Sequence, residues 1–433
     1  MKDPIWKKSN NTDQADPAIM AFLAGEDVVL DKQLLLFDIK ASAAHVSGLE
    51  KINILSEEEA AQLRNGLRQL EEEVAAGDRE LDSSYEDGHS AIESWLTEML
   101  GDAGAKIHTG RSRNDQVAVA LRLYMKDRLS QLQGICIEVA TVLLERIKTE
   151  AMLPMAGYTH LQSAMPSSAG LWLAGHAEAF IDNAELAALT NQWLDASPLG
   201  TASGFGVNLD LQRNSVAEEL GFQRLVVNPQ YAQNSRGKIE LQALSVLSAC
   251  TLDLRRIAWD LSLFTTHEFD FLELPSQYCT GSSIMPNKHN PDTVELLRAV
   301  HGVVQGAQTE MASVLSLPSG YQRDLQATKP PLIRAFSKGI EALLLLPDML
   351  SGFEWKVDKM RASITPEMLA TDRATNLARD GIPFREAYKI AAAEIGTMNM
   401  DNIEQSLAQR SSPGGCGNLG TDILEARVKA LRN

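Results

Sequence analysis

Apolar side chains recur at intervals of three or four residues over much of the chain, which is the spacing that keeps them on one face of a helix. The first clear run contains Ala60, Leu63, Leu67, Leu70 and Val74. Ser56 and Glu59 form a capping-box pattern before this run, and Gly77 stands where a C-terminal glycine cap would follow. The pattern predicts an amphipathic helix between Ser56 and Gly77.

A much longer apolar stripe lies between Asp115 and Pro154, where no proline interrupts the chain. Its members are Leu121, Met125, Leu129, Leu132, Cys136, Val139, Leu143 and Ile147. A helix of roughly 35 residues would be about 50 Å long, which is typical of extended bundles. Further helices are predicted over residues 167–196, 239–271 and 291–317, and alternating strand patterns are scarce. We therefore expect an all-α fold with a long central helical bundle.

Shorter and more broken helical patterns flank this bundle on both sides. We expect an N-terminal helical domain over residues 1–110, a central bundle and oligomer core over 111–360, and a small C-terminal helical domain over 361–433. Residues 411–420 are rich in glycine and are predicted to form a loop. The apolar stripes exceed what one subunit would cover, so we expect a homo-oligomer.

The charge balance narrows the class of protein. The net charge is −17 at pH 7, which argues against binding to nucleic acid or to an anionic membrane. The first ten residues carry charges and a proline where a signal peptide needs an apolar run, and no stretch reaches the length of a membrane span. The four cysteines are scattered without a paired motif. We expect a cytoplasmic protein with reduced thiols.

Three polar segments, each carrying glycine or proline, interrupt the helices. His108–Gln116 reads HTGRSRNDQ and combines guanidiniums, which suit carboxylate recognition, with a carboxylate and small polar side chains. Gly157–Gln162 reads GYTHLQ and places a histidine, suited to proton transfer, in a polar loop. Gly281–Pro291 reads GSSIMPNKHNP and suits a flexible lid over a substrate. Taken singly, each segment is also compatible with an exposed connection between helices.

Other kinds of site lack their sequence patterns. The chain has no H-E-x-x-H motif, no paired cysteine motif and no acidic cluster at metal-ligand spacing, so we expect no metal. Phosphate-binding loops and dinucleotide fingerprints are also missing, and no G-x-S-x-G elbow occurs. We expect a small-molecule substrate and no cofactor.

Together, in this order and spacing, the three segments resemble those of the fumarase/aspartase superfamily of lyases. GSSIMPNKHNP is similar to the signature loop of that superfamily, and HTGRSRNDQ with GYTHLQ resembles the argininosuccinate lyase family within it. The resemblance extends over nearly the whole chain. Supporting matches are Glu86-Asp87 before His89, the run from Ser197 to Gly200, and Tyr321 to Gln326 with Lys329.

This resemblance implies cleavage of argininosuccinate into arginine and fumarate by anti β-elimination, the last step of arginine biosynthesis. It implies Ser282 as the base, Lys288 as a partner of the alkoxide or of the substrate carboxylate, and Asn290 as a donor to the same region. His160 would protonate the leaving nitrogen or support the group that does. Further substrate-contact positions are Asn114, Thr159, Tyr321, Gln326 and Lys329. Supporting positions are Asp87, Ser112, Arg113 and Arg236.

Several residues depart from the family pattern and indicate a divergent branch. Gly25 aligns with a usual serine, Ala327-Thr328 with a usual Glu-Asp, and Gly237 with a usual aspartate. These departures leave two questions open. One is how the amino-acid end of the arginine moiety is bound, and the other is whether the substrate carries an acyl group on its α-amine. One alternative is another fumarate-releasing lyase, acting on adenylosuccinate, aspartate or malate. A second is a catalytically silent, crystallin-like scaffold. The resemblance also implies a homotetramer in which three chains contribute to each active site.

Overall fold

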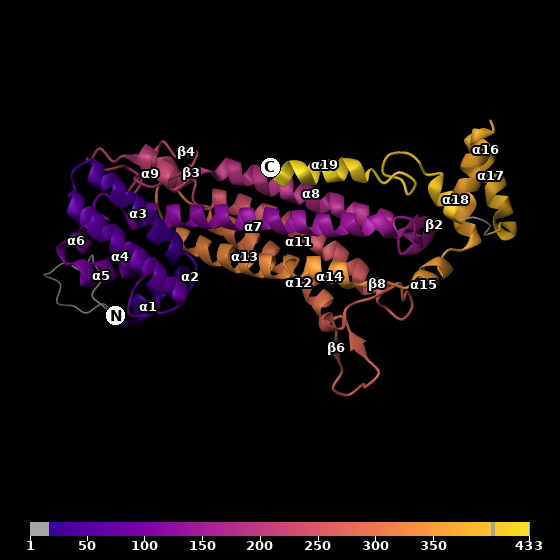
Figure 1. Cartoon of the computed structure of the whole chain (residues 1–433), viewed down its shortest axis with the longest axis horizontal. Helices are drawn as coiled ribbons and strands as arrows, with labels where there is room; N and C mark the ends of the chain where they lie inside the picture. The colour runs from indigo at the N-terminus through magenta and orange to yellow at the C-terminus, as the bar shows by residue number, and fades with distance from the viewer. Residues whose placement is uncertain (1–16, 400–402, 433) are drawn as a thin grey trace. The chain divides into compact units, whose positions relative to one another are not determined.

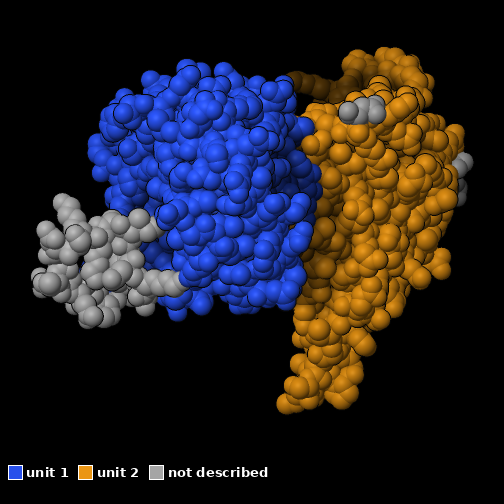
Figure 2. Space-filling view, turned by 60° about the vertical axis from the view of Figure 1, so that its left-hand side comes forward, with its two compact units in different colours: residues 1–131, 188–245, 305–337 blue, residues 132–187, 246–304, 338–433 orange. Residues whose placement is uncertain are grey.

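Helices make up most of the regular structure in the computed structural model, which describes residues 17–399 and 403–432 (Figure 1). The chain divides into two compact units (Figure 2). Unit 1 comprises residues 1–131, 188–245 and 305–337, and unit 2 comprises 132–187, 246–304 and 338–433. The all-α prediction is confirmed. The predicted three-part division at residues 110 and 360 stays a prediction.

Unit 1 has its main core among helices from the first hundred residues. The clustered side chains include Leu49, Leu63, Leu67, Trp95 and Leu96, all of which are buried. The helices complete within this unit are α1 (Pro17–Ala24), α2 (Asp27–Asp31), α3 (Leu35–Lys51), α4 (Glu57–Ala76), α5 (Gly88–Leu100), α6 (Asp102–Ala105), α9 (Arg213–Glu219) and α10 (Pro229–Asn234). Two short strands, β3 (Ala196–Ser197) and β4 (Arg224–Leu225), pair in parallel.

Helix α4 shows how the sequence pattern becomes structure. The Ser56 hydroxyl accepts a hydrogen bond from the backbone N–H of Glu59, and the Glu59 carboxylate accepts one from the backbone N–H of Ser56. Gly77 ends the helix in the left-handed region at φ +79°, where glycine has no Cβ penalty. The predicted capping box, helix and C-cap are all confirmed.

The long predicted helices are also confirmed, although the one predicted over residues 239–271 ends at Phe264, and each contributes residues to both units. They are α7 (Arg113–Glu150), α8 (Ala169–Leu194), α11 (Lys238–Phe264) and α12 (Asp292–Val314), followed by the shorter α13 (Lys329–Leu343). Within unit 2, Asn183 on α8 donates to Asp253 on α11 at 2.9 Å, and Thr251 on α11 lies 3.2 Å from a ring nitrogen of His301 on α12. These contacts join neighbouring helices of the bundle.

Unit 2 is completed by short elements after the bundle. The helices are α14 (Leu346–Gly352), α15 (Val357–Ala362), α16 (Ala370–Arg379), α17 (Phe384–Glu394), α18 (Ile403–Ala408) and α19 (Thr421–Arg432). Strand β5 (Leu272–Glu273) pairs antiparallel with β8 (Glu354–Trp355). No helix in residues 411–420 interrupts the predicted glycine-rich loop. Within residues 17–399 and 403–432, no helix is long and apolar enough to cross a membrane.

The segment around His160 folds as a β-hairpin rather than as a plain loop between helices. Strand β1 (Pro154–Thr159) pairs antiparallel with β2 (Gln162–Ser168), and His160 and Leu161 form the two-residue turn. Both turn residues have positive φ, at 56° and 57°, as a type I′ hairpin turn requires. Proline, glycine and small side chains in the strands hide the alternation by which such strands are normally found.

A second short hairpin carries the signature loop in unit 2. Strands β6 (Thr280–Gly281) and β7 (His289–Asn290) pair antiparallel, with Thr280 opposite Asn290. The hairpin projects away from the bundle helices of this unit in Figure 1. Ile284 at its tip is 82% exposed. The signature loop is therefore presented to its surroundings and is not packed into the core of its own unit.

Candidate active site

Unit 1 contains a polar cavity of about 600 Å³. Its lining comes from the α1–α2 segment, the start of α5, the start of α7, the loop around residues 202–207, Arg236, and the segment 321–329. Eight residues predicted from the sequence lie in this lining: Asp87, Ser112, Arg113, Asn114, Arg236, Tyr321, Gln326 and Lys329. Residues that are up to about 300 positions apart in the chain therefore share one cavity.

The start of helix α7 is attached to the loop that borders the cavity through Asp115. The backbone N–H of Ser112 donates to Oδ1 of Asp115 at 2.9 Å, and the backbone N–H groups of Gly200 and Ala202 donate to Oδ2 at 3.0 and 2.9 Å. Burial raises the pKa of Asp115, although these three N–H groups and Arg111 oppose the increase. Asp115 is a positioning residue, and it was not among the site residues predicted from the sequence.

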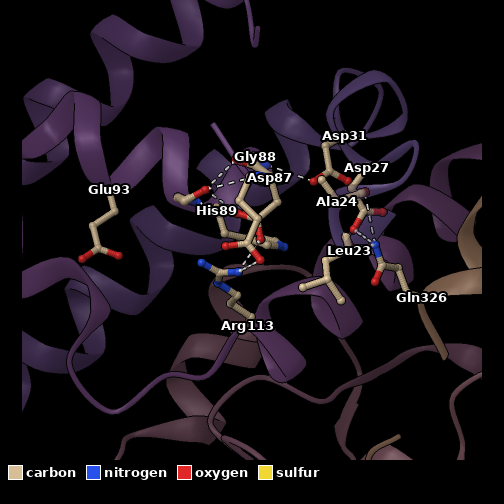
Figure 3. A network of polar contacts seen from close by, with 12 residues as sticks. Leu23, Ala24, Asp27, Asp31, Asp87, Gly88, His89, Glu93, Arg113 and Gln326 are labelled. Carbon is tan, nitrogen blue, oxygen red and sulfur yellow. Dashed lines mark hydrogen bonds and ion pairs between the residues drawn. The ribbon is translucent and has the colours of Figure 1, made fainter. Parts of the chain in front are cut away.

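Arg113 is held against two carboxylates at the start of α5 (Figure 3). Its Nη1 lies 2.9 Å from Oε1 of Glu86 and 3.2 Å from Oδ2 of Asp87. Asp87 also caps α5 by accepting from the backbone N–H of Ser90 at 2.8 Å. Burial raises the pKa of Asp87, but the charges of His89 and Arg113, with the Ser90 N–H, outweigh burial and lower it. Asp87 is thus kept as a carboxylate at the cavity wall.

Lys329 lies at the opposite end of this polar network, between two aspartates. Its Nζ is 2.6 Å from Oδ1 of Asp31 and 2.8 Å from Oδ1 of Asp27. Burial lowers the pKa of Lys329, but the two aspartates outweigh burial, so the pKa is raised. The backbone N–H of Gly88 donates to Oδ2 of Asp31 at 2.9 Å. Helices α2 and α5 are thereby joined to the start of α13.

Asp27 lines the cavity but was not among the residues predicted from the sequence. Its Oδ2 accepts a hydrogen bond from Nε2 of Gln326 at 2.7 Å, and the same amide donates to the carbonyl oxygen of Leu23 at 3.0 Å (Figure 3). Gly25, which aligns with the usual serine of the family, does not line the cavity and has φ +55°. The signal available in the sequence was the pair of aspartates four residues apart, at positions 27 and 31.

A buried pair of one histidine and one aspartate, His89 and Asp38, lies next to this network. Nδ1 of His89 is hydrogen bonded to Oδ2 of Asp38, and both side chains are buried. Burial lowers the pKa of His89, but the charge and hydrogen bond of Asp38 outweigh burial and raise it. Nearby, Arg111 donates from Nη1 to the hydroxyl of Ser42 at 2.8 Å. These pairs attach helix α5 and the 108–113 segment to α3.

The other five predicted residues belong to unit 2, and none of them lines the unit 1 cavity. Thr159 and His160 lie at the tip of the β1–β2 hairpin, where both side chains are exposed. Ser282, Lys288 and Asn290 lie in and beside the loop of the β6–β7 hairpin. The cavity of unit 1 is therefore formed without any of the residues implied in proton transfer.

The signature loop is folded around the Ser282 oxygen. Oγ of Ser282 accepts hydrogen bonds from the backbone N–H groups of Ile284 at 3.3 Å and Met285 at 3.0 Å. The backbone N–H of Lys288 donates to the carbonyl oxygen of Met285 at 3.1 Å and closes the turn. Two N–H dipoles directed at one hydroxyl oxygen favour negative charge on that oxygen.

The sequence comparisons with known proteins all point to lyases. The Lyase family matches residues 10–306. The argininosuccinate lyase of Xanthomonas axonopodis pv. citri (strain 306) is 54% identical over 433 residues, covering 100% of both chains. That of Stenotrophomonas maltophilia (strain R551-3) is 55% identical over 432 residues, again covering 100% of both.

Solved structures share the fold at lower identity. An EDDS lyase in complex with formate superposes with a TM-score of 0.81 at 23% identity, covering 97% of this chain and 92% of that one. A class II fumarase from Schistosoma mansoni gives 0.71 at 18% identity, covering 95% and 94%. This chain therefore shares its fold with that lyase and that fumarase. With more than half of all positions identical to full-length relatives, this chain belongs to the argininosuccinate lyase family.

Proposed function

We propose that this protein cleaves argininosuccinate into arginine and fumarate by anti β-elimination. The observation that carries the proposal is the identity of 54% with argininosuccinate lyases over the entire chain. The site chemistry supports it, because a cavity lined by carboxylates, guanidiniums and amides suits a substrate that carries carboxylates, an amine and a guanidino group. Neither alternative, another superfamily lyase or a silent scaffold, gains support from a specific feature of this chain.

The first step removes a proton from the carbon next to a carboxylate of the succinate moiety. In this proposal the Ser282 alkoxide takes the proton, and the electron pair of the C–H bond moves into the adjacent carboxylate as an aci-carboxylate dianion. A serine needs its alkoxide stabilised before it can act as a base. The N–H groups of Ile284 and Met285 already donate to its oxygen. Lys288 and Asn290 would stabilise the charge on the substrate carboxylate.

The second step breaks the bond between carbon and the guanidino nitrogen. The electron pair of the dianion forms the double bond of fumarate, and the pair of the C–N bond leaves with nitrogen, which then takes a proton. His160 either gives that proton or supports the group that does. Its place at an exposed two-residue turn suits contact with a substrate held by another surface.

The unit 1 cavity would hold the rest of the substrate. Gln326, Tyr321 and Asn114 supply amide and hydroxyl groups to its lining, and Arg113 is oriented by Glu86 and Asp87. This division assigns binding to the cavity of unit 1 and proton transfer to the hairpins of unit 2. Thr159, next to His160, belongs to the second group.

We also infer a homotetramer in which each site collects residues from different chains, in the cytoplasm. The proton-transfer residues are exposed or half-buried on two hairpins of unit 2, and the cavity of unit 1 forms without them. The described part of the unit 2 bundle also exposes large apolar side chains, among them Leu252, Trp259, Leu296 and Val303. Such apolar surface favours burial against other copies of the chain.

The function is tested by incubating the purified protein with argininosuccinate without added metal or cofactor. We expect fumarate to appear, as measured by its ultraviolet absorbance, with arginine in equal amount. Adenylosuccinate, aspartate and malate are the matched comparison substrates. Rapid fumarate release from one of these, with none from argininosuccinate, would move the assignment to another lyase. No turnover with any of the four would favour the silent scaffold.

A further inference from the structure

The Asp27 carboxylate has unused hydrogen-bonding capacity that faces the cavity. Oδ1 of Asp27 forms an ion pair with Lys329, and Oδ2 accepts a hydrogen bond from Gln326. A carboxylate offers about four acceptor positions, so further donors can be accommodated. The Asp27 side chain is 17% exposed and lines the cavity, whereas the Asp31 side chain is 4% exposed and does not. Of these two aspartates, only Asp27 can reach a bound molecule.

The charges around Asp27 favour an additional cation. Lys329 is the single positive charge between Asp27 and Asp31, and Arg113 is already shared between Glu86 and Asp87. Burial raises the pKa of Asp27, and the nearby charges of Asp31 and Asp87 add to this effect, while Lys329 opposes it. A positively charged group placed beside Asp27 would remove this repulsion. Lys329 itself is only 3% exposed and is already paired with two carboxylates.

We propose that Asp27 is a specificity-determining residue that binds the α-ammonium group of the arginine moiety and selects substrates whose α-amine is free. The inference rests on the proposed function, because the ammonium belongs to argininosuccinate. Gln326 and Lys329, two of the expected substrate-contact residues, both contact Asp27. An ammonium brings three donors and a charge, whereas an acylated amine brings one donor and added bulk, which would leave Asp27 unpaired.

The test uses ligands that differ only at the α-carbon and the variant Asp27→Asn, which keeps the size of the side chain and removes its charge. Arginine carries both an ammonium and a carboxylate, agmatine lacks the carboxylate, and 5-guanidinovalerate lacks the ammonium. Binding of each to the assembled enzyme is measured by calorimetry. Asp27→Asn should weaken the binding of arginine and agmatine by about 10- to 100-fold, as expected for a hydrogen bond to a charged group. The affinity for guanidinovalerate should stay nearly unchanged.

Glu93→Gln is the matched control, because Glu93 also lines the cavity but lies apart from Asp27 (Figure 3). Its charge change is the same, so it should leave the ratio of arginine to guanidinovalerate affinity unaltered. In turnover, wild-type protein should cleave Nα-acetylargininosuccinate with a kcat/KM at least about 100-fold below that for argininosuccinate, and Asp27→Asn should narrow the difference.

The proposal would be overturned if Asp27→Asn weakened the binding of guanidinovalerate as much as that of arginine. That result would show that Asp27 acts only by holding Lys329. Wild-type protein that binds guanidinovalerate as tightly as arginine would overturn it as well. These binding results do not depend on turnover. Failure of the proposed function is recognised separately, by the absence of fumarate release from argininosuccinate by the wild-type protein.

Discussion

Two backbone N–H groups near the oxygen of Ser282 are the residue-scale feature that distinguishes this serine from its neighbour. Ile284 and Met285 donate to Oγ of Ser282, and the adjacent Ser283 side chain is exposed. A hydroxyl whose anion is stabilised by oriented dipoles can act as a base near neutral pH, whereas an ordinary serine cannot. The two adjacent serines therefore form a matched pair for mutagenesis.

Ser282→Ala should lower kcat by about 10²- to 10⁴-fold, because it removes the group proposed to take the proton. Substrate binding should change little, since the unit 1 cavity does not include Ser282. Ser283→Ala should retain a much larger share of the activity. Steady-state rates and calorimetric Kd values of both variants check this. A Ser282→Ala enzyme with near wild-type kcat would exclude Ser282 as the base.

His89 gives stability with a defined dependence on pH. Its pKa is raised in the folded state because Asp38 outweighs burial. The contribution is therefore fully present below the unfolded pKa of about 6.5 and is lost as pH rises through the folded pKa. His89→Gln should cost about 3–5 kcal/mol near pH 6, because a buried pair loses one partner. The difference in Tm from wild type should shrink at higher pH.

His45 is the control of opposite sign. Burial lowers its pKa to about 3, and Arg111 adds to this effect, so its ring is neutral in the folded protein. Because only the unfolded chain binds a proton at His45 near pH 6, the free energy of unfolding falls as pH drops below about 6.5. Above that value the contribution of His45 stays constant. The Tm difference between wild type and His45→Gln should therefore be flat from pH 7 to 9, where that of His89→Gln declines. Parallel curves for the two variants would contradict the assigned protonation states.

At the scale of single elements, the β1–β2 hairpin depends on an unusual backbone turn. His160 and Leu161 both have positive φ, and neither is glycine. The left-handed region costs about 1–2 kcal/mol per non-glycine residue, so strand pairing on both sides must hold the turn in place. This strain is located at the residue implied in proton transfer.

Changes at Leu161 separate the turn from its side chain. Leu161 is 71% exposed, so its side chain contributes little to packing. Leu161→Gly should preserve the turn, keep kcat within a few-fold and leave Tm equal or higher. Leu161→Pro fixes φ near −65°, which the turn cannot accept, and should lower kcat/KM by about 10²-fold through misplacement of His160. Equal activity of the two variants would mean that the turn geometry is unimportant for catalysis.

At the scale of the whole molecule, the separation of binding and proton-transfer residues between units predicts complementation between chains. In the proposed tetramer, the His160→Ala and Ser282→Ala variants should each be nearly inactive. Unfolding and reassembling them together should restore part of the activity, because some hybrid sites combine an intact His160 from one chain with an intact Ser282 from another. Recovery stays partial because other sites collect both lesions.

Each mutant reassembled alone is the control and should recover nothing. Hybrid formation is verified by native mass spectrometry, with one mutant carrying a mass label. If hybrids form and activity remains at the level of the separate mutants, then His160 and Ser282 of one site lie on one chain. That result would contradict the shared-site arrangement while leaving the proposed reaction intact.

The sequence by itself determined the elements that depend on local spacing. The stripe from Leu121 to Ile147 predicted helix α7, and Ser56, Glu59 and Gly77 predicted both ends of α4, because helical periodicity and capping involve residues within a few positions of each other. The family, too, was evident in three short segments, whose residue types match the chemistry of proton transfer and carboxylate binding.

Only the tertiary structure decided which distant side chains meet. Asp27 and Lys329 are about 300 positions apart, and their pairing depends on how α2 and α13 are placed in unit 1. The same holds for Asp115, whose carboxylate joins α7 to residues 200 and 202. No local pattern encodes such contacts, because they result from the packing of whole helices. For this reason the sequence directed attention to Gly25, whereas packing places Asp27 at the cavity.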